Sequence, residues 1–291
     1  MSVFKFPKIL YLVMSCRQDL FEHEETVIKD TWMKFVGHGN VCIIYKGNYE
    51  KISFSSSNST LYCTSDDSLD GTFIKTQEAI RYIRDYVFND FDYIVRTNTS
   101  TYVNVELIEK FLLNIYNREN LKDKMICGDI SVLNHKIQLR GNSIIIPRHY
   151  ADLICDFNID ELKNENLENL HDDVVISHIW EKNSNNNYSD ELSKISHELI
   201  HSPCIYFNDE YRKNHPQSLF DYENNWKKNM CGSLFLAFRK NKGCRYDEIG
   251  ECYKIHDVIK DSNSYTFLKF NKIPIWIYEL KRFMLIDNEL Y

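Results

Sequence analysis

Three short polar side chains follow an apolar stretch in the first half of the chain. The run Tyr93–Arg96 has the composition of a buried strand, and Asn98, Thr99 and Ser100 come almost directly after it. Ligands in α/β proteins bind where strands end, because backbone groups and short polar side chains are held there on a rigid support. The three side chains are therefore candidate ligand contacts. An ordinary turn that caps the helix expected to follow explains them equally well.

Two adjacent acids form a second candidate site. Asp172 and Asp173 stand at the start of an expected helix, Val174–Trp180. Neighbouring side chains at a helix start point in different directions, so one carboxylate can accept bonds from helix N–H groups while the other faces a reactant. A carboxylate in that position can serve as a general base. In the alternative, purely structural reading, Asp172 caps the helix and Asp173 is a solvated acid of its first turn.

Strand and helix patterns alternate through the first two thirds of the chain, which predicts an α/β fold with a mostly parallel sheet flanked by helices. Expected strands are Lys8–Met14, Val41–Tyr45, Tyr62–Thr64, Tyr93–Arg96, Met125–Ser131 and Asn142–Pro147, and expected helices are Leu20–Phe35, Phe73–Val87, Val105–Asn117 and Ala151–Phe157. The stretch Ser53–Thr60 has the composition of a polar loop. The C-terminal part is less regular and contains β structure, including a strand expected at Leu234–Arg239.

The composition is that of a globular protein with a substantial core and no preference for nucleic acid. Hydrophobic residues make up 43% of the 291 residues, which is enough to bury a sizeable core. Lys and Arg number 35 against 42 Asp and Glu, a net charge of −7. Because affinity for a phosphate backbone depends on basic side chains, nucleic acid is not expected as the main partner.

The cysteines and the first apolar segment indicate a cytoplasmic protein without a membrane span. The nine cysteines include no Cys-x-x-Cys pair, which favours reduced thiols, although one disulfide among Cys231, Cys244 and Cys252 stays open. The apolar run Ile9–Met14 is too short to cross a bilayer, and polar residues follow it at once. We therefore expect neither a signal peptide nor an anchor.

Four blocks, in order, resemble motifs of the fringe-like and β-1,3-glycosyltransferase family. They are Leu10–Phe35, which closes on Asp-Thr-Trp; Gly71–Thr76; the Arg96–Asn104 patch; and Leu170–Ile179 with its Asp-Asp-Val. Gly141–Ile146 is also similar to the family's acceptor-side strand. The resemblance covers roughly residues 8–205 and implies the GT-A architecture. It implies a nucleotide-binding half at about 1–104, an acceptor half at about 105–205, and a C-terminal extension at 206–291.

The family resemblance implies an inverting glycosyltransferase that moves a sugar from a nucleotide-sugar donor, usually UDP-linked, to a hydroxyl of a glycan. Asp173 would be the general base. We prefer it to Asp172 because some relatives have Glu in the preceding position. The base and ribose of the donor would lie near Ser15 and Arg17, at the end of the first strand.

The acidic metal motif of the family is degenerate in this chain. Asn98, Thr99 and Ser100 stand where the family has acids, and they lack the charged oxygens that Mn²⁺ or Mg²⁺ prefers. We therefore expect no essential metal and no other cofactor. The diphosphate charge would be offset by Arg96, Lys75 or Arg17 and by the hydroxyls of Thr99 and Ser100.

His201 lies where the family presents a histidine to the metal. Without the acidic motif, a hydrogen bond to the diphosphate and a purely structural role are both open. Two other functions also stay open. The chain could be a non-catalytic relative that binds sugar or nucleotide, or a transferase whose acceptor is nucleic acid or protein.

Overall fold

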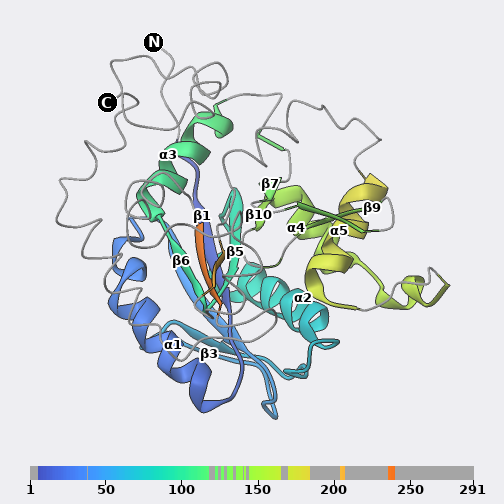
Figure 1. Ribbon diagram of the computed structural model, residues 1–291, viewed down its shortest axis with the longest axis horizontal. Coiled ribbons are helices and arrows are strands. Elements are labelled where there is room, and N and C mark those ends of the chain that lie inside the picture. Colours follow the sequence, from blue (N-terminus) through green and yellow to red (C-terminus); the bar gives the residue numbers. More distant parts are fainter. Residues whose placement is uncertain are drawn as a thin grey trace.

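The computed structural model has a mixed α/β fold in which a mostly parallel sheet is flanked by helices (Figure 1). The predicted fold class is confirmed at this level. The structure describes residues 6–117 except 38, then 122–123, 126–127, 130–133, 136–139, 141, 144–164, 170–183, 204–206 and 235–239.

The main sheet has seven strands in the order β3-β4-β2-β1-β5-β10-β7. Their bounds are β1 Ile9–Met14, β2 Val41–Lys46, β3 Ser53–Ser55, β4 Thr60–Tyr62, β5 Tyr93–Asn98, β7 Ile126–Cys127 and β10 Ile144–Pro147. Strands β4, β2, β1 and β5 run parallel, whereas β3 and β10 are antiparallel to their neighbours. The carboxyl ends of the four parallel strands therefore meet at one edge, beside the start of β10. We call this the carboxyl edge.

Helices cover both faces of the sheet (Figure 1). On one side lie α1 Asp19–Asp30, the short helix η1 Trp32–Phe35 and α3 Val105–Tyr116, and on the other lie α2 Thr72–Tyr82, α4 Arg148–Asp156 and α5 Asp172–Asn183. Two further short helices are η2 Ile83–Val87, which continues α2, and η3 Ile159–Asn164.

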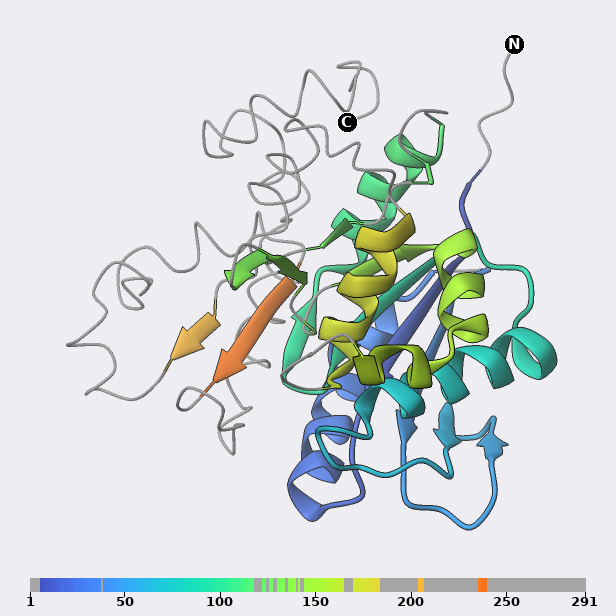
Figure 2. The ribbon, with the colours of Figure 1, turned by 90° about the vertical axis from the view of Figure 1, so that its right-hand side faces the viewer.

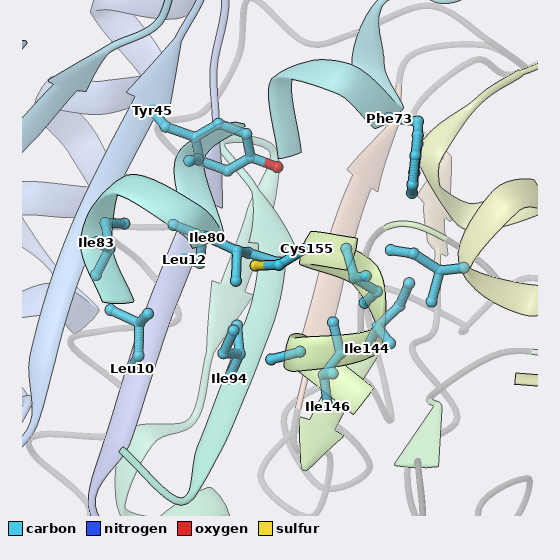
Figure 3. Close-up of a cluster of buried hydrophobic side chains, with 14 of the residues drawn as sticks. Leu10, Leu12, Tyr45, Phe73, Ile80, Ile83, Ile94, Ile144, Ile146 and Cys155 are labelled. Carbon is cyan, nitrogen blue, oxygen red and sulfur yellow. The ribbon is translucent and has the colours of Figure 1, made fainter. Parts of the chain in front are cut away.

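The central strands are apolar at successive positions because both of their faces are buried. Leu10 and Leu12 of β1 belong to the cluster that β1 forms with β5, α2, α4 and α5, and they lie near Ile94 and Ile80 (Figure 3). Tyr11 points to the opposite face, where its ring centroid lies 6.3 Å from that of Trp32. Side chains of a strand alternate between faces, so one six-residue strand supplies both cores.

A second, smaller sheet lies beside the main one, on the side away from α2 (Figure 2). It contains β6 Thr101–Val103, β11 Cys204–Tyr206 and β12 Phe235–Arg239, in the order β11-β12-β6. β12 pairs antiparallel with β6, and Ala237 stands opposite Thr101. Strands β8 Ile130–Leu133 and β9 Lys136–Leu139 form a separate antiparallel pair.

Several local expectations were wrong. The expected loop Ser53–Thr60 contains β3 and the first residue of β4, which pair across a turn. The single strand expected at Met125–Ser131 is divided between β7 and β8, and neither β6 nor β9 was expected. β6 has only three residues, and its partner β12 is remote in the chain. Its own sequence therefore does not identify it as a strand.

Other expectations concern parts of the chain that the structure describes little or not at all. Residues 206–291 lie outside the described residues except for Tyr206 and β12, which matches the expected strand at Leu234–Arg239. The domain boundaries stay predictions, and the cysteines 231, 244 and 252 lie outside the described part. Among the helices in the described part, none is both long and apolar enough to cross a membrane.

Replacing Ile94 by Ala should lower the free energy of unfolding by about 2–5 kcal/mol, because the side chain is fully buried in the central cluster and its loss leaves a cavity. Urea unfolding followed by circular dichroism measures the change. The matched control is Leu69→Ala, at a side chain that is 68% exposed, which should shift stability by less than about 0.5 kcal/mol. Equal effects of the two substitutions would contradict the assigned core.

Candidate functional site

The carboxyl edge brings together most of the residues that the sequence singled out. Ser15 and Arg17 follow β1, Asn98 ends β5, and α5 begins with Asp172 beside the same edge. In the register of the sheet, Met14 at the end of β1 stands opposite Asn98. The segments before residue 104 and after residue 141 therefore meet here.

Arg96 and Asp172 form a buried ion pair across this junction. The Nη2 atom of Arg96 lies 2.5 Å from Oδ2 of Asp172, and the two residues are 2% and 4% exposed. Arg96 stands two positions after Ile94 on β5, so it lies on the same face of the sheet, where the apolar core gives way to the start of α5. The pair thus joins the central strand to α5.

Burial and the partner's charge act in opposite directions on the pKa of each member of this pair. Desolvation raises the pKa of Asp172 to about 6, although the Arg96 charge acts in the opposite direction. Burial alone would lower the pKa of Arg96, but Asp172 raises it above its ordinary value. Thr76 supports the pair because its Oγ1 donates to Oδ2 of Asp172 over 3.3 Å and lies 2.8 Å from the hydroxyl of Tyr45. Asp172 is thus a confined, paired carboxylate.

Asp173 is held differently and is only half-buried. Its Oδ2 accepts a hydrogen bond of 3.1 Å from the N–H of Gly141, and its Oδ1 accepts one of 2.9 Å from the N–H of Val174. The hydroxyl of Ser177 donates to the Asp173 carbonyl and accepts the N–H of Leu139 at 2.8 Å. The carboxylate is therefore oriented by the segment that precedes β10, and it keeps access to solvent. Chemically, it is the better placed of the two acids to take a proton.

One face of α2 braces the carboxyl edge. Thr72, Lys75 and Thr76 lie three and four residues apart and so share a side of the helix. Thr72 Oγ1 accepts the N–H of Asp172 at 3.1 Å. These residues fall in the second block of the resemblance, and the structure gives them contacts within the protein.

Lys75 is fully buried and already has a carboxylate partner. Its Nζ lies 2.6 Å from Oδ1 of Asp67 and donates to the carbonyl of Ser15 at 2.9 Å. Asp67 also accepts the backbone N–H groups of Arg17 at 2.7 Å and Gly47 at 2.8 Å, and so fixes the turns that follow β1 and β2. Sequence reasoning missed Asp67, although it belongs to an acidic pair directly after an expected strand.

Gly47 is required at its position by the close approach of the chain. A Cβ atom there would lie 2.2 Å from the carbonyl oxygen of Ser65 and 2.8 Å from Oδ1 of Asp67. Only a residue without a side chain lets these turns approach each other so closely.

Arg17 is the exposed member of the three cations that the sequence proposed for the diphosphate, since Lys75 and Arg96 are buried in ion pairs. Its guanidinium lies 5.1 Å from the ring centroid of Tyr49, and its Nη1 donates to the carbonyl of Asn48 at 3.2 Å. A cation over an aromatic face is attracted by the ring. Tyr49, which sequence reasoning missed, thus supports Arg17 at the end of β2.

Ser15 is buried in a polar network below this point. Its hydroxyl donates to Oε1 of Glu25 at 2.5 Å, and Nζ of Lys46 lies 3.1 Å from both oxygens of Glu25. The network ties α1 to the ends of β1 and β2. The hydroxyl of Ser15 is therefore engaged inside the protein.

The polar patch after β5 is also buried and internally bonded. The hydroxyls of Ser100 and Thr101 both donate to Oδ1 of Asn98 at 2.9 Å, and the hydroxyl of Thr99 donates to the Glu24 carboxylate. All four residues of the 98–101 stretch are at most 4% exposed. The helix-cap alternative was wrong, because β6 follows the patch and α3 begins only at residue 105. The role of these hydroxyls toward a diphosphate stays a prediction.

The metal and histidine expectations receive no direct test. His201 lies outside the described residues. Within the described part of the chain, no group of three or more His, Cys, Asp or Glu side chains is arranged to hold a metal ion. Among the described residues, Cys16, Cys42, Cys63 and Cys155 form no disulfide bond.

No protein-family model matches the chain, and no curated protein sequence matches it.

Replacing Asp172 by Asn should remove a contribution to the free energy of unfolding that falls as pH rises. Burial raises the pKa of Asp172 from 3.8 to about 6, so between these values the folded state holds a proton that the unfolded state releases. The contribution of this group to the free energy of unfolding therefore falls as pH rises from 3.8 to about 6, and stays constant above that. The amide of the variant cannot titrate, so in urea unfolding the stability of the variant relative to the wild type should increase as pH rises from 3.8 to about 6.

Asp156→Asn, at an exposed acid at the end of α4, is the matched control and should change neither the slope nor the stability appreciably. A wild-type slope in the Asp172 variant would contradict the assigned burial of this acid.

Proposed function

We propose that the protein is an inverting glycosyltransferase of the GT-A type. It transfers a sugar from a nucleotide-sugar donor, UDP-linked by the family resemblance, to a hydroxyl of a glycan, and Asp173 is the general base. The proposal depends chiefly on one observation: Asp172 of the Asp-Asp-Val block pairs with Arg96 near the end of β5, and its neighbour Asp173 stays accessible. Two blocks of the resemblance that are distant in the sequence are thus adjacent in space.

The two acids divide the work by their environments. Asp172 is paired with Arg96 and is only 4% exposed, so it holds the start of α5 in place. Asp173 is half-buried, and two backbone N–H groups fix its direction. Each of its oxygens has further lone pairs for an incoming hydroxyl group. A fixed but accessible carboxylate is what a general base requires.

In the proposed reaction, Asp173 accepts the proton of the acceptor hydroxyl as the acceptor oxygen forms a bond to the anomeric carbon of the donor. The bond between that carbon and the diphosphate oxygen breaks on the opposite face, and its electron pair leaves with the diphosphate. The configuration at the anomeric carbon is therefore inverted.

The donor would bind over the ends of β1 and β2. Arg17 is exposed there above Tyr49, and an arginine can bind phosphate oxygens with two parallel hydrogen bonds. Because Lys75 and Arg96 have carboxylate partners, we assign the main offset of donor charge to Arg17 and not to them. No acid stands at positions 98–100 to bind a metal, so we propose that a metal is not essential.

A second function is favoured by the buried polar patch. Asn98, Thr99 and Ser100 direct their side chains into the protein, so they form a structural junction. A non-catalytic relative that binds a nucleotide or sugar could use this junction as a purely structural support. It would bind UDP but release none from UDP-sugars, with or without acceptor, whereas the transferase would release it.

Replacing Asp173 by Asn should lower turnover by about 100- to 10,000-fold, because the variant loses the proton acceptor. The affinity for UDP should not change, since Asp173 does not contact the donor's nucleotide in the proposal. UDP release from UDP-glucose, UDP-galactose and UDP-xylose measures turnover, and titration calorimetry with UDP measures affinity. Asp156→Asn is the control for the same chemical change at an exposed site. Wild-type turnover in Asp173→Asn would exclude the assigned base.

Replacing Arg17 by Ala should raise the Kd for UDP by roughly 10- to 150-fold, equivalent to about 1.5–3 kcal/mol for a lost hydrogen bond to a charged group. The effect should shrink as salt is added. Arg148→Ala is the matched control, because Arg148 starts α4 at the opposite edge of the sheet. Equal UDP affinities in the wild type and the Arg17 variant would remove the donor from this end of β1.

A further inference from the structure

We propose that Arg96 is a positioning residue that aims the carboxylate of Asp173, and that it does not bind the donor diphosphate. The inference rests on the proposed role of Asp173 as the base. In this inference Arg96 and Gly141 together orient the Asp173 carboxylate, a role that the sequence does not indicate for either residue.

The first step is the contact set of Arg96. Its Nη2 is bound to Asp172 at 2.5 Å and lies 3.4 Å from the sulfur of Met14. The residue is 2% exposed, and in the register of the sheet it stands between Leu12 and Ile144. A guanidinium enclosed in this way would have to leave a buried carboxylate to reach a diphosphate, which would strand that charge.

The second step links Arg96 to Gly141. A Cβ atom on Gly141 would lie 2.7 Å from Nη1 of Arg96 and 3.4 Å from Oδ2 of Asp173. The guanidinium therefore packs against the bare face of this glycine. The N–H of the same residue donates to Asp173 over 3.1 Å. Arg96 thus touches the residue that orients the proposed base.

The third step is the balance of charge. One guanidinium faces two carboxylates, and both of them raise the pKa of Arg96, whose burial acts in the opposite direction. Asp172 takes the direct contact with Arg96, so Asp173 is the acid of the two that keeps access to solvent. By pairing with Asp172, Arg96 leaves Asp173 as the accessible acid. By packing against Gly141, it also holds in place the N–H group that orients Asp173.

The experiment measures the orientation of Asp173 without relying on activity. The amide proton resonance of Gly141 reports its hydrogen bond to the carboxylate, and its position in Asp173→Ala, which has no acceptor on its side chain, calibrates the loss of that bond. In Arg96→Lys, which keeps the charge but loses the planar fork, we expect this resonance to move toward the calibrated position. The affinity for UDP should stay within about threefold of wild type. Arg148→Lys, at the opposite edge, should move neither.

A second variant approaches the junction from the other side. Gly141→Ala keeps the backbone group but places a methyl against Nη1 of Arg96, and the glycine has no left-handed backbone that would itself resist the change. We expect the residue 141 amide resonance to shift in the same direction and turnover to fall while the UDP affinity holds. This variant decides the question if Arg96→Lys does not fold.

Two results would overturn the inference. An unmoved Gly141 resonance in Arg96→Lys would show that Arg96 does not orient Asp173. A loss of UDP affinity of about tenfold or more, equivalent to about 1.4 kcal/mol, would return Arg96 to the donor site. Neither readout needs turnover, so both stand even if the protein is not a transferase. Failure of the proposed transferase function itself would show separately, as normal turnover in Asp173→Asn or as no turnover in the wild type.

Discussion

The ion pair between Arg96 and Asp172 is the contact on which the candidate site depends. It joins the end of the central strand to the start of α5, and it is almost fully withdrawn from solvent. A buried pair of this kind contributes little net stability compared with apolar packing, but it penalises any arrangement that separates the charges. Its main effect is therefore to specify one relative placement of β5 and α5. The accessible carboxylate of Asp173 follows from that placement.

The same principle recurs along the carboxyl edge. Lys75 is paired with Asp67, and Lys46 with Glu25, each at a strand end where a polar turn must be held against the core. The bonds of Asp67 to two backbone N–H groups show that these pairs also satisfy donors that the sheet leaves free. Charged residues that a sequence presents as ligand contacts can thus be the internal frame of the edge. Arg17, by contrast, is exposed.

The alternation of apolar runs was enough to predict the class of fold and most strands of the main sheet, because strands buried on both faces leave a clear pattern, as in Ile9–Met14. The meeting of Arg96 with Asp172 was reached only through motif order, since local sequence does not encode contacts between remote segments. The burial of Asn98 and its neighbours could not be foreseen either. Whether a short polar side chain faces solvent or the interior is decided by packing, here with β6 and α1.

The pairing of β6 with β12 has a consequence for how the molecule is assembled. Thr101 stands opposite Ala237, so the strand next to the buried polar turn finds its partner only when a much later part of the chain is present. Contacts of such long sequence separation form slowly, because a large loop must close first. On the ribosome the earlier strands can already collapse while β6 is still an open edge. Until β12 arrives, the unpaired backbone groups of β6 would be a site for wrong association of nascent chains.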